Sequence, residues 1–131
     1  MKNATFEVAD SSSYDGGPYD VIAFFDCIHD MANPAAAAKH ARTKLANDGH
    51  VMVVEPFAND RLEDNLNPVG RVYYGASTMV CVPVSLAQKG PALGAQAGEQ
   101  RLRDVFVGQG GFKTLRRATE TPFNLVLEAR P

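Results

Sequence analysis

Three side chains that can move protons follow one apolar run. Asp26, His29 and Asp30 come at or just beyond the end of residues 20–26. An imidazole near neutral pH can accept a proton from a hydroxyl, amine or thiol, and a neighbouring carboxylate can orient the ring or raise its basicity. Because open α/β sheets bind ligands beyond the carboxyl ends of their strands, we expect His29 to act as a catalytic base, with Asp30 contacting substrate. The alternative is that both acids bind turn amides while His29 is solvated.

A further acid, Glu55, ends the next apolar run at residues 50–55. It either contacts substrate or is an ordinary carboxylate at the corner between a strand and a loop. Together with Asp26, His29 and Asp30 it would also provide the oxygen-rich set that a hard metal ion prefers. The spacing of these residues matches no specific metal motif, so the sequence predicts no resident metal.

The segments around these residues have the pattern of an α/β sheet. Residues 20–26 form a nearly continuous apolar run between acids, typical of a parallel strand covered by helices on both faces. Asn33 followed by Pro34 predicts a capped helix that continues through residues 35–45 and ends at residues 47–49. Because another strand is predicted over residues 50–55, strand, helix and strand fit one right-handed parallel crossover.

The remaining segments predict further elements on either side of this crossover. Residues 5–9 alternate as a half-buried strand does, and residues 68–84 are typical of an irregular helix. Residues 99–107 predict an amphipathic helix with its apolar residues on one stripe. Residues 112–117 and 123–129 predict two strands, most simply antiparallel because they are adjacent in the sequence.

Length and composition limit the classes of protein that the chain can belong to. Its 131 residues predict one domain, and 45% hydrophobic with 21% charged residues is typical of globular proteins. A net charge of -2 argues against nucleic acid or a lipid surface as a partner. The chain has no apolar run long enough for a membrane span and no signal-type N-terminus, so we expect a cytoplasmic protein. Cys27 and Cys81 form no paired motif and are expected to be reduced thiols.

Four segments, in order, resemble the later strands of a class I S-adenosylmethionine-dependent methyltransferase. They are residues 24–31, 49–56, 110–112 and 124–129. The resemblance covers almost the whole chain and corresponds to the C-terminal half of that family's domain. It implies a single partial domain over residues 1–131, with an incomplete Rossmann-like fold: a mainly parallel sheet that closes with an antiparallel strand pair.

The same resemblance implies where cofactor and substrate bind. Residues 8–10 would be the family's third strand, whose terminal acid faces the adenine of the cofactor. The implied S-adenosylmethionine contacts are Asp10, Ser11, Phe25, Asp26 and Cys27. Substrate selection in the family comes from the region after its fifth strand, which makes Tyr73 a candidate contact for a small-molecule acceptor, with core packing as the alternative. His29 would then take a proton from the acceptor as the methyl group is transferred.

One part of the family pattern has no counterpart in this sequence: the first strand, its glycine-rich turn and the acid that ends the second strand. The implied sheet order leaves residues 21–25 as an apolar edge strand that needs a partner. Residues 5–9 could fold across to it, two copies could pair, or a separate N-terminal polypeptide could fill the gap; we expect a homodimer. Two functions stay open, methyl transfer completed by such a partner and a non-catalytic binding or assembly module.

Overall fold

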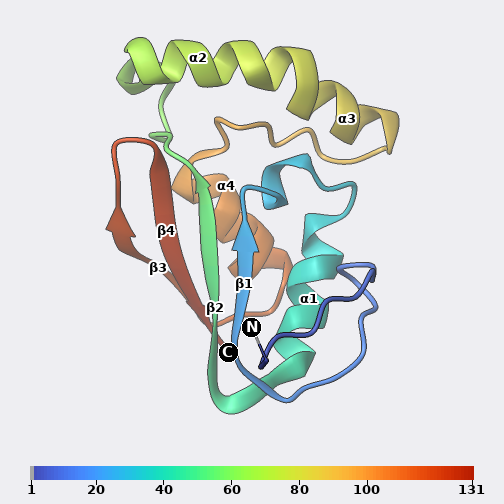
Figure 1. Cartoon of the computed structure of the whole chain (residues 1–131). Helices are drawn as coiled ribbons and strands as arrows, with labels where there is room; N and C mark the ends of the chain where they lie inside the picture. The colour runs from blue at the N-terminus through green and yellow to red at the C-terminus, as the bar shows by residue number, and fades with distance from the viewer. Residues whose placement is uncertain (1) are drawn as a thin grey trace.

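The sheet and its strand order are the features that position the candidate site. The computed structural model describes residues 2–131. Its four strands lie in the order β1-β2-β4-β3 (Figure 1). Strands β1 and β2 are parallel, while β4 is antiparallel to both β2 and β3. The expected α/β fold, with a parallel crossover and a C-terminal antiparallel pair, is confirmed. The strands are β1 (Tyr19–Phe25), β2 (Leu45–Pro56), β3 (Thr114–Glu120) and β4 (Asn124–Arg130).

The crossover helix α1 (Pro34–Lys44) begins as the sequence predicts. The Asn33 side chain accepts a hydrogen bond from the Ala36 amide at 2.9 Å, and Pro34 occupies the first turn, where its missing N–H costs nothing. The predicted end at residues 47–49 is wrong. The helix stops at Lys44 because β2 begins at the next residue, and residues 45–49 are extended.

A second helical run crosses the carboxyl ends of β1 and β2 (Figure 1). It consists of α2 (Pro68–Ala76), the π-helical segment η3 (Ser77–Cys81) and α3 (Val82–Ala87), and it confirms the irregular helix expected over residues 68–84. Pro83 has no N–H to continue the α-helical ladder, and the wider π-helical turns lie directly before it.

The core lies between the sheet, α1 and the last helical segment. That segment comprises α4 (Gly98–Arg103) and the π-helical η4 (Asp104–Gln109). Its predicted apolar stripe, Leu102, Val105 and Phe106, is at most 3% exposed. The Phe106 ring packs edge-on between Phe24 and Phe112, with ring centroids 6.1 and 5.7 Å away. No helix formed by residues 2–131 combines the length and the apolar character that crossing a membrane takes.

Two expectations about the N-terminal part are wrong. Residues 5–9 form no strand, and the Phe6 and Val8 side chains are almost fully exposed. An alternating pattern becomes a strand only where a neighbouring edge supplies hydrogen bonds, and this segment lies beside none.

Strand β1 pairs only with β2 among residues 2–131, so the predicted apolar edge is confirmed. Val21 and Phe25 are 50% and 62% exposed, so the predicted cover on both faces of β1 is not found.

The close approach of α2 to the short helix η2 (Leu62–Asn65) yields a stability prediction. A Cβ at Gly70 would overlap the backbone oxygen of Asn65, whereas a Cβ at Gly75, in the same helix, would meet no atom within 4 Å. We expect Gly70→Ala to lower the free energy of unfolding by about 1–3 kcal/mol because the turn must shift. The matched variant Gly75→Ala should raise it by up to ~1 kcal/mol through helix propensity. Urea denaturation measures both, and equal effects of the two variants would contradict the packing argument.

Candidate functional site

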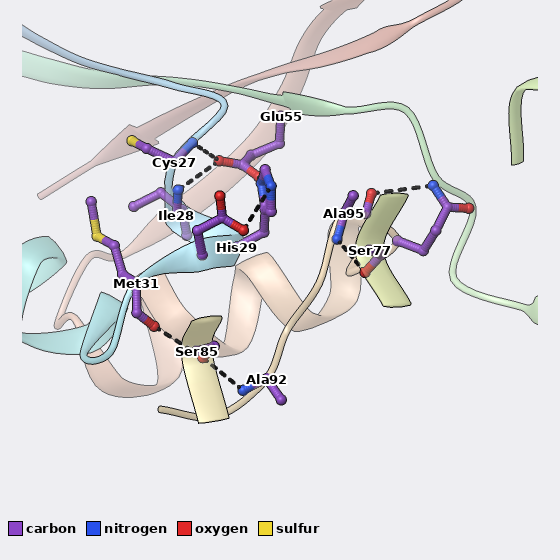
Figure 2. A network of polar contacts seen from close by, with 11 residues as sticks. Cys27, Ile28, His29, Met31, Glu55, Ser77, Ser85, Ala92 and Ala95 are labelled. Atoms are coloured by element: carbon purple, nitrogen blue, oxygen red, sulfur yellow. Dashed lines mark hydrogen bonds and ion pairs between the residues drawn. The ribbon is translucent and has the colours of Figure 1, made fainter. Parts of the chain in front are cut away.

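Glu55 joins the ends of the two parallel strands. Its side chain is 2% exposed. Its Oε1 accepts hydrogen bonds from the Cys27 amide at 3.1 Å and the Ile28 amide at 2.8 Å. Its Oε2 lies 2.5 Å from Nδ1 of His29. Figure 2 shows the Glu55 carboxylate next to the imidazole. Of the two interpretations of Glu55, the geometry favours the corner carboxylate, here fully buried and bound to the turn that follows β1.

His29 is buried against two carboxylates. It lies in the short helix η1 (Ile28–Asp30) and is 5% exposed, so it is not the solvated residue of the alternative interpretation. Its Nε2 is 3.3 Å from Oδ1 of Asp30. Burial by itself lowers the pKa of His29, but the hydrogen bond and charge of Glu55, followed by the charge of Asp30, outweigh it and raise the pKa above 6.5. The imidazole is therefore a stronger base than a free histidine.

Asp26 does not join this cluster. It adopts a φ of 45° as the chain leaves β1, and its amide donates to the carbonyl of Val54 at 2.8 Å. Its carboxylate turns toward β4, where it accepts a hydrogen bond from the Asn124 side chain at 3.3 Å. Among residues 2–131, the four-residue hard-metal set considered from the sequence is not gathered at one point. Both carboxylate oxygens of Glu55 are already bonded to the two amides and the imidazole.

A cleft of about 380 Å³ brings four predicted site residues together. Asp10, Ser11, Cys27 and Asp30 all line it. Both hydrogen bonds to the Asp10 carboxylate end on Oδ1 and come from Ser12, from its amide at 2.8 Å and its hydroxyl at 2.5 Å. These bonds lower the pKa of Asp10, so its carboxylate is ionised at neutral pH.

The turn that carries Asp10 and Ser11 is held against α1. The Ser13 and Tyr14 amides both donate to the Asp10 carbonyl at 3.1 Å. Nε2 of His40, in α1, lies 2.8 Å from the Tyr14 carbonyl, and the two rings pack edge to face at 4.5 Å. The cleft wall nearest the N-terminus is thus fixed by contacts with α1 and does not depend on a strand.

The opposite wall of the cleft comes from residues that sequence reasoning missed. Met31, Val84 and Gln88 line it, the last two from α3 and the residue after it. Ser85 fixes α3 in place, since its hydroxyl donates to the Met31 carbonyl at 3.3 Å and accepts from the Ala92 amide at 3.1 Å (Figure 2). No signal in the sequence pairs α3 with η1, because the two segments lie far apart along the chain.

The cleft is not lined by the other five predicted site residues, which are Asp26, His29, Glu55, Phe25 and Tyr73. The Phe25 side chain stays largely exposed on β1. Tyr73 lines a separate apolar pocket of about 240 Å³ together with Pro68, Val69, Val72 and Phe123. The Tyr73 hydroxyl donates to the Phe123 carbonyl at 2.9 Å. Burial, followed by the charge of Asp26, raises the pKa of Tyr73.

Comparison with known proteins decides the family. The model of the family described as "Methyltransferase domain" matches residues 1–88. The chain belongs to the methyltransferase domain family. No curated protein matches the sequence.

Solved structures with the same fold are distant in sequence. The structure of TnmH superposes with a TM-score of 0.72 at 16% identity, over 99% of this chain and 36% of that protein. Human N-acetylserotonin methyltransferase in complex with S-adenosylmethionine gives a TM-score of 0.65 at 14% identity, over 98% and 36%. An O-methyltransferase family protein from Burkholderia thailandensis gives 0.60 at 19% identity, over 95% and 35%. This methyltransferase-family chain thus spans about a third of the length of each.

The buried Glu55 carboxylate yields a second stability prediction. We expect Glu55→Ala to lower the free energy of unfolding by about 3–5 kcal/mol, because two amides and an imidazole lose their buried acceptor. Glu55→Gln keeps one carbonyl oxygen and should lose about 1–3 kcal/mol. Glu63→Ala, at a side chain that is 67% exposed, serves as the control and should change stability by less than ~0.5 kcal/mol. A loss for Glu55→Ala as small as the control's, measured by urea denaturation, would show that the network carries little energy.

Proposed function

We propose that this domain takes part in S-adenosylmethionine-dependent methyl transfer to a hydroxyl group of a small molecule, with His29 as general base. The observation that carries the proposal is the buried pair of His29 and Glu55 at the carboxyl ends of the parallel strands. A base is needed where the acceptor must lose a proton as it attacks. Family membership supports the reaction class, and the hydroxyl acceptor is suggested by the O-methyltransferase among the structural neighbours.

The cleft fits the nucleoside part of this cofactor. Asp10 and Ser11 offer a carboxylate and a hydroxyl to its amino and hydroxyl groups, while Met31 and Val84 offer apolar contact to a flat ring. Cys27 lines the same cleft. Phe25 and Asp26 are further proposed contacts at the end of β1. The family's glycine-rich turn, which would hold the amino-acid end, has no counterpart in residues 2–131. When bound, the cofactor supplies a methyl group on a positively charged sulfur.

His29 acts in this proposal through Nε2. Glu55 accepts a hydrogen bond from the N–H at Nδ1, which fixes the ring and leaves the lone pair on Nε2. The Asp30 carboxylate lies beside Nε2, and Asp30 also lines the cleft. An acceptor hydroxyl in the cleft would reach Nε2 by displacing the Asp30 carboxylate. The hydroxyl proton then moves to Nε2, and the carboxylate of Glu55 stabilises the imidazolium. Tyr73 stays a proposed acceptor contact, through the apolar pocket that it lines.

Calorimetric titration with S-adenosylmethionine tests the cofactor site. We expect saturable binding at micromolar concentration. Asp10→Ala should weaken it by about 10–100-fold, the value of a hydrogen bond to a charged group. Asp48→Ala is the matched control, since Asp48 is an exposed acid at the start of β2 and away from the cleft. No heat at millimolar ligand would contradict the proposal and favour a non-catalytic binding or assembly module.

The same experiment separates binding from chemistry. His29→Gln should bind S-adenosylmethionine as the wild type does, because His29 acts on the acceptor. Its production of S-adenosylhomocysteine with a panel of small phenols should fall by about 10²–10⁴-fold, the usual contribution of a general base. Unchanged turnover in His29→Gln would remove His29 from the reaction.

The proposed setting is the cytoplasm. Cys27 and Cys81 are both free thiols, which suits a reducing compartment. Burial, followed by the charge of Glu55, raises the pKa of the Cys27 thiol to about 11. Burial, followed by the neighbouring Asp30 carboxylate, raises the pKa of Cys81 to about 11 as well. Both cysteines are therefore protonated at neutral pH and unreactive as nucleophiles.

We also propose that two copies of the chain pair through β1. This strand is bonded on one side only among residues 2–131, and Tyr19, Val21 and Phe25 expose apolar surface along it. Such an edge is a template for another strand. A separate polypeptide is the other candidate partner and would leave the isolated chain monomeric.

Light scattering over a range of concentrations tests the pairing. We expect the mass of a dimer at micromolar concentration and a monomer for Val21→Lys, because a charge on an edge strand blocks pairing. Met79→Lys, at a residue that is 75% exposed in η3, is the control and should leave the mass unchanged. A strictly monomeric wild-type chain at micromolar concentration would contradict the homodimer.

A further inference from the structure

A second constellation forms around the Nε2 atom of His29. One ligand atom each from His29, Asp30 and Cys81 lie within 4.8 Å of one another, and Nε2 of His29 is 3.3 Å from Oδ1 of Asp30. Two of these residues come from η1 and the third ends η3, so the cluster exists only because the α2–α3 run crosses the strand ends.

The separations in this cluster suit a tetrahedral metal ion. Zinc binds nitrogen and oxygen at ~2.0–2.2 Å and sulfur at ~2.3 Å, which places neighbouring ligand atoms ~3.3–3.8 Å apart. The distance from His29 Nε2 to Asp30 Oδ1 is 3.3 Å. The limit of 4.8 Å on the other two separations leaves only a small side-chain movement for the thiol.

The surroundings of the three atoms also favour a cation. Oδ1 of Asp30 is buried and, among residues 2–131, no group donates a well-directed hydrogen bond to it. Cys81 is 7% exposed and forms no disulfide. Glu55 holds Nδ1 of His29, which is how a carboxylate outside the coordination shell orients a metal-binding imidazole.

We propose that His29, Asp30 and Cys81 form a three-residue binding site for a divalent cation of the zinc class. On binding, the sulfur–hydrogen bond of Cys81 breaks, its proton leaves to solvent and the sulfur binds as a thiolate. Asp30 binds as a carboxylate and His29 as a neutral imidazole through Nε2. The two negative ligands cancel the charge of the ion, which suits a buried position. The partly exposed Asp30 side chain, which lines the cleft, gives a path for entry, and a water can complete the tetrahedron.

The ligand set selects the kind of metal. A thiolate and an imidazole are ligands for zinc or cobalt, whereas magnesium prefers oxygen alone. A cation on Nε2 would also occupy the lone pair that accepts the proton in methyl transfer, so zinc would inhibit the reaction; this consequence alone depends on the proposed function.

Cobalt titration of the full chain, purified under reducing conditions and stripped of metal, tests the site. We expect tetrahedral cobalt bands and a thiolate-to-cobalt absorption that zinc displaces and magnesium does not. Cys81→Ser should remove the sulfur absorption and weaken binding by about 100-fold or more, since loss of a ligand costs more than loss of an outer partner. Cys27→Ser is the matched control, because Cys27 lies near Glu55 but outside the cluster, and it should keep the full spectrum.

X-ray absorption of the zinc-loaded wild-type chain tests the same ligand set and does not depend on whether the variants fold. One sulfur at ~2.3 Å with nitrogen and oxygen neighbours is the expected shell. A cobalt spectrum without a thiolate-to-cobalt absorption would overturn the site. So would an absorption that Cys27→Ser removes as fully as Cys81→Ser does. Metal binding together with failed S-adenosylmethionine binding would leave the metal site standing and reject only the proposed reaction.

Discussion

The carboxylate of Glu55 is the point on which the arrangement at the strand ends depends. A buried charge is stable only when its oxygens are fully bonded, and Glu55 meets that condition with two amides and one imidazole. All of these partners lie in the short segment that follows β1. The hydrogen bonds therefore close the turn after the strand and fix η1, and with it Cys27 and Asp30, which line the cleft.

The parallel pairing of β1 and β2 makes this interaction possible. Phe25 is paired with Val54. Glu55, the residue after Val54, therefore lies beside the turn that follows Phe25 at the same edge of the sheet. Glu55 points into the covered side of the sheet, on the face that carries Val51 and Val53, and there it finds the amides of the turn. A strand order that separated β1 from β2 would leave Glu55 buried without donors.

The α2–α3 run supplies the other half of the site. It crosses the same strand ends and is tied down by two serines, since Ser77 and Ser85 accept hydrogen bonds from the Ala95 and Ala92 amides (Figure 2). These bonds hold the run between η1 and the segment that leads to α4. Val84 thereby reaches the cleft and Cys81 reaches His29. One rigid crossing thus shapes both the proposed cofactor cleft and the proposed cation site.

Local sequence patterns determined β1, the cap of α1, the buried stripe of α4 and η4, and the order of motifs that indicates a methyltransferase. These features depend on neighbouring residues and on periodicity, which a sequence displays directly. Only the tertiary structure decided that residues 5–9 form no strand, that Glu55 turns inward, and that Cys81 and Val84 meet η1. Each of these depends on contacts between distant segments: a strand needs a neighbouring edge, a buried acid needs donors, and a side chain's neighbours across the fold are set by how whole elements pack.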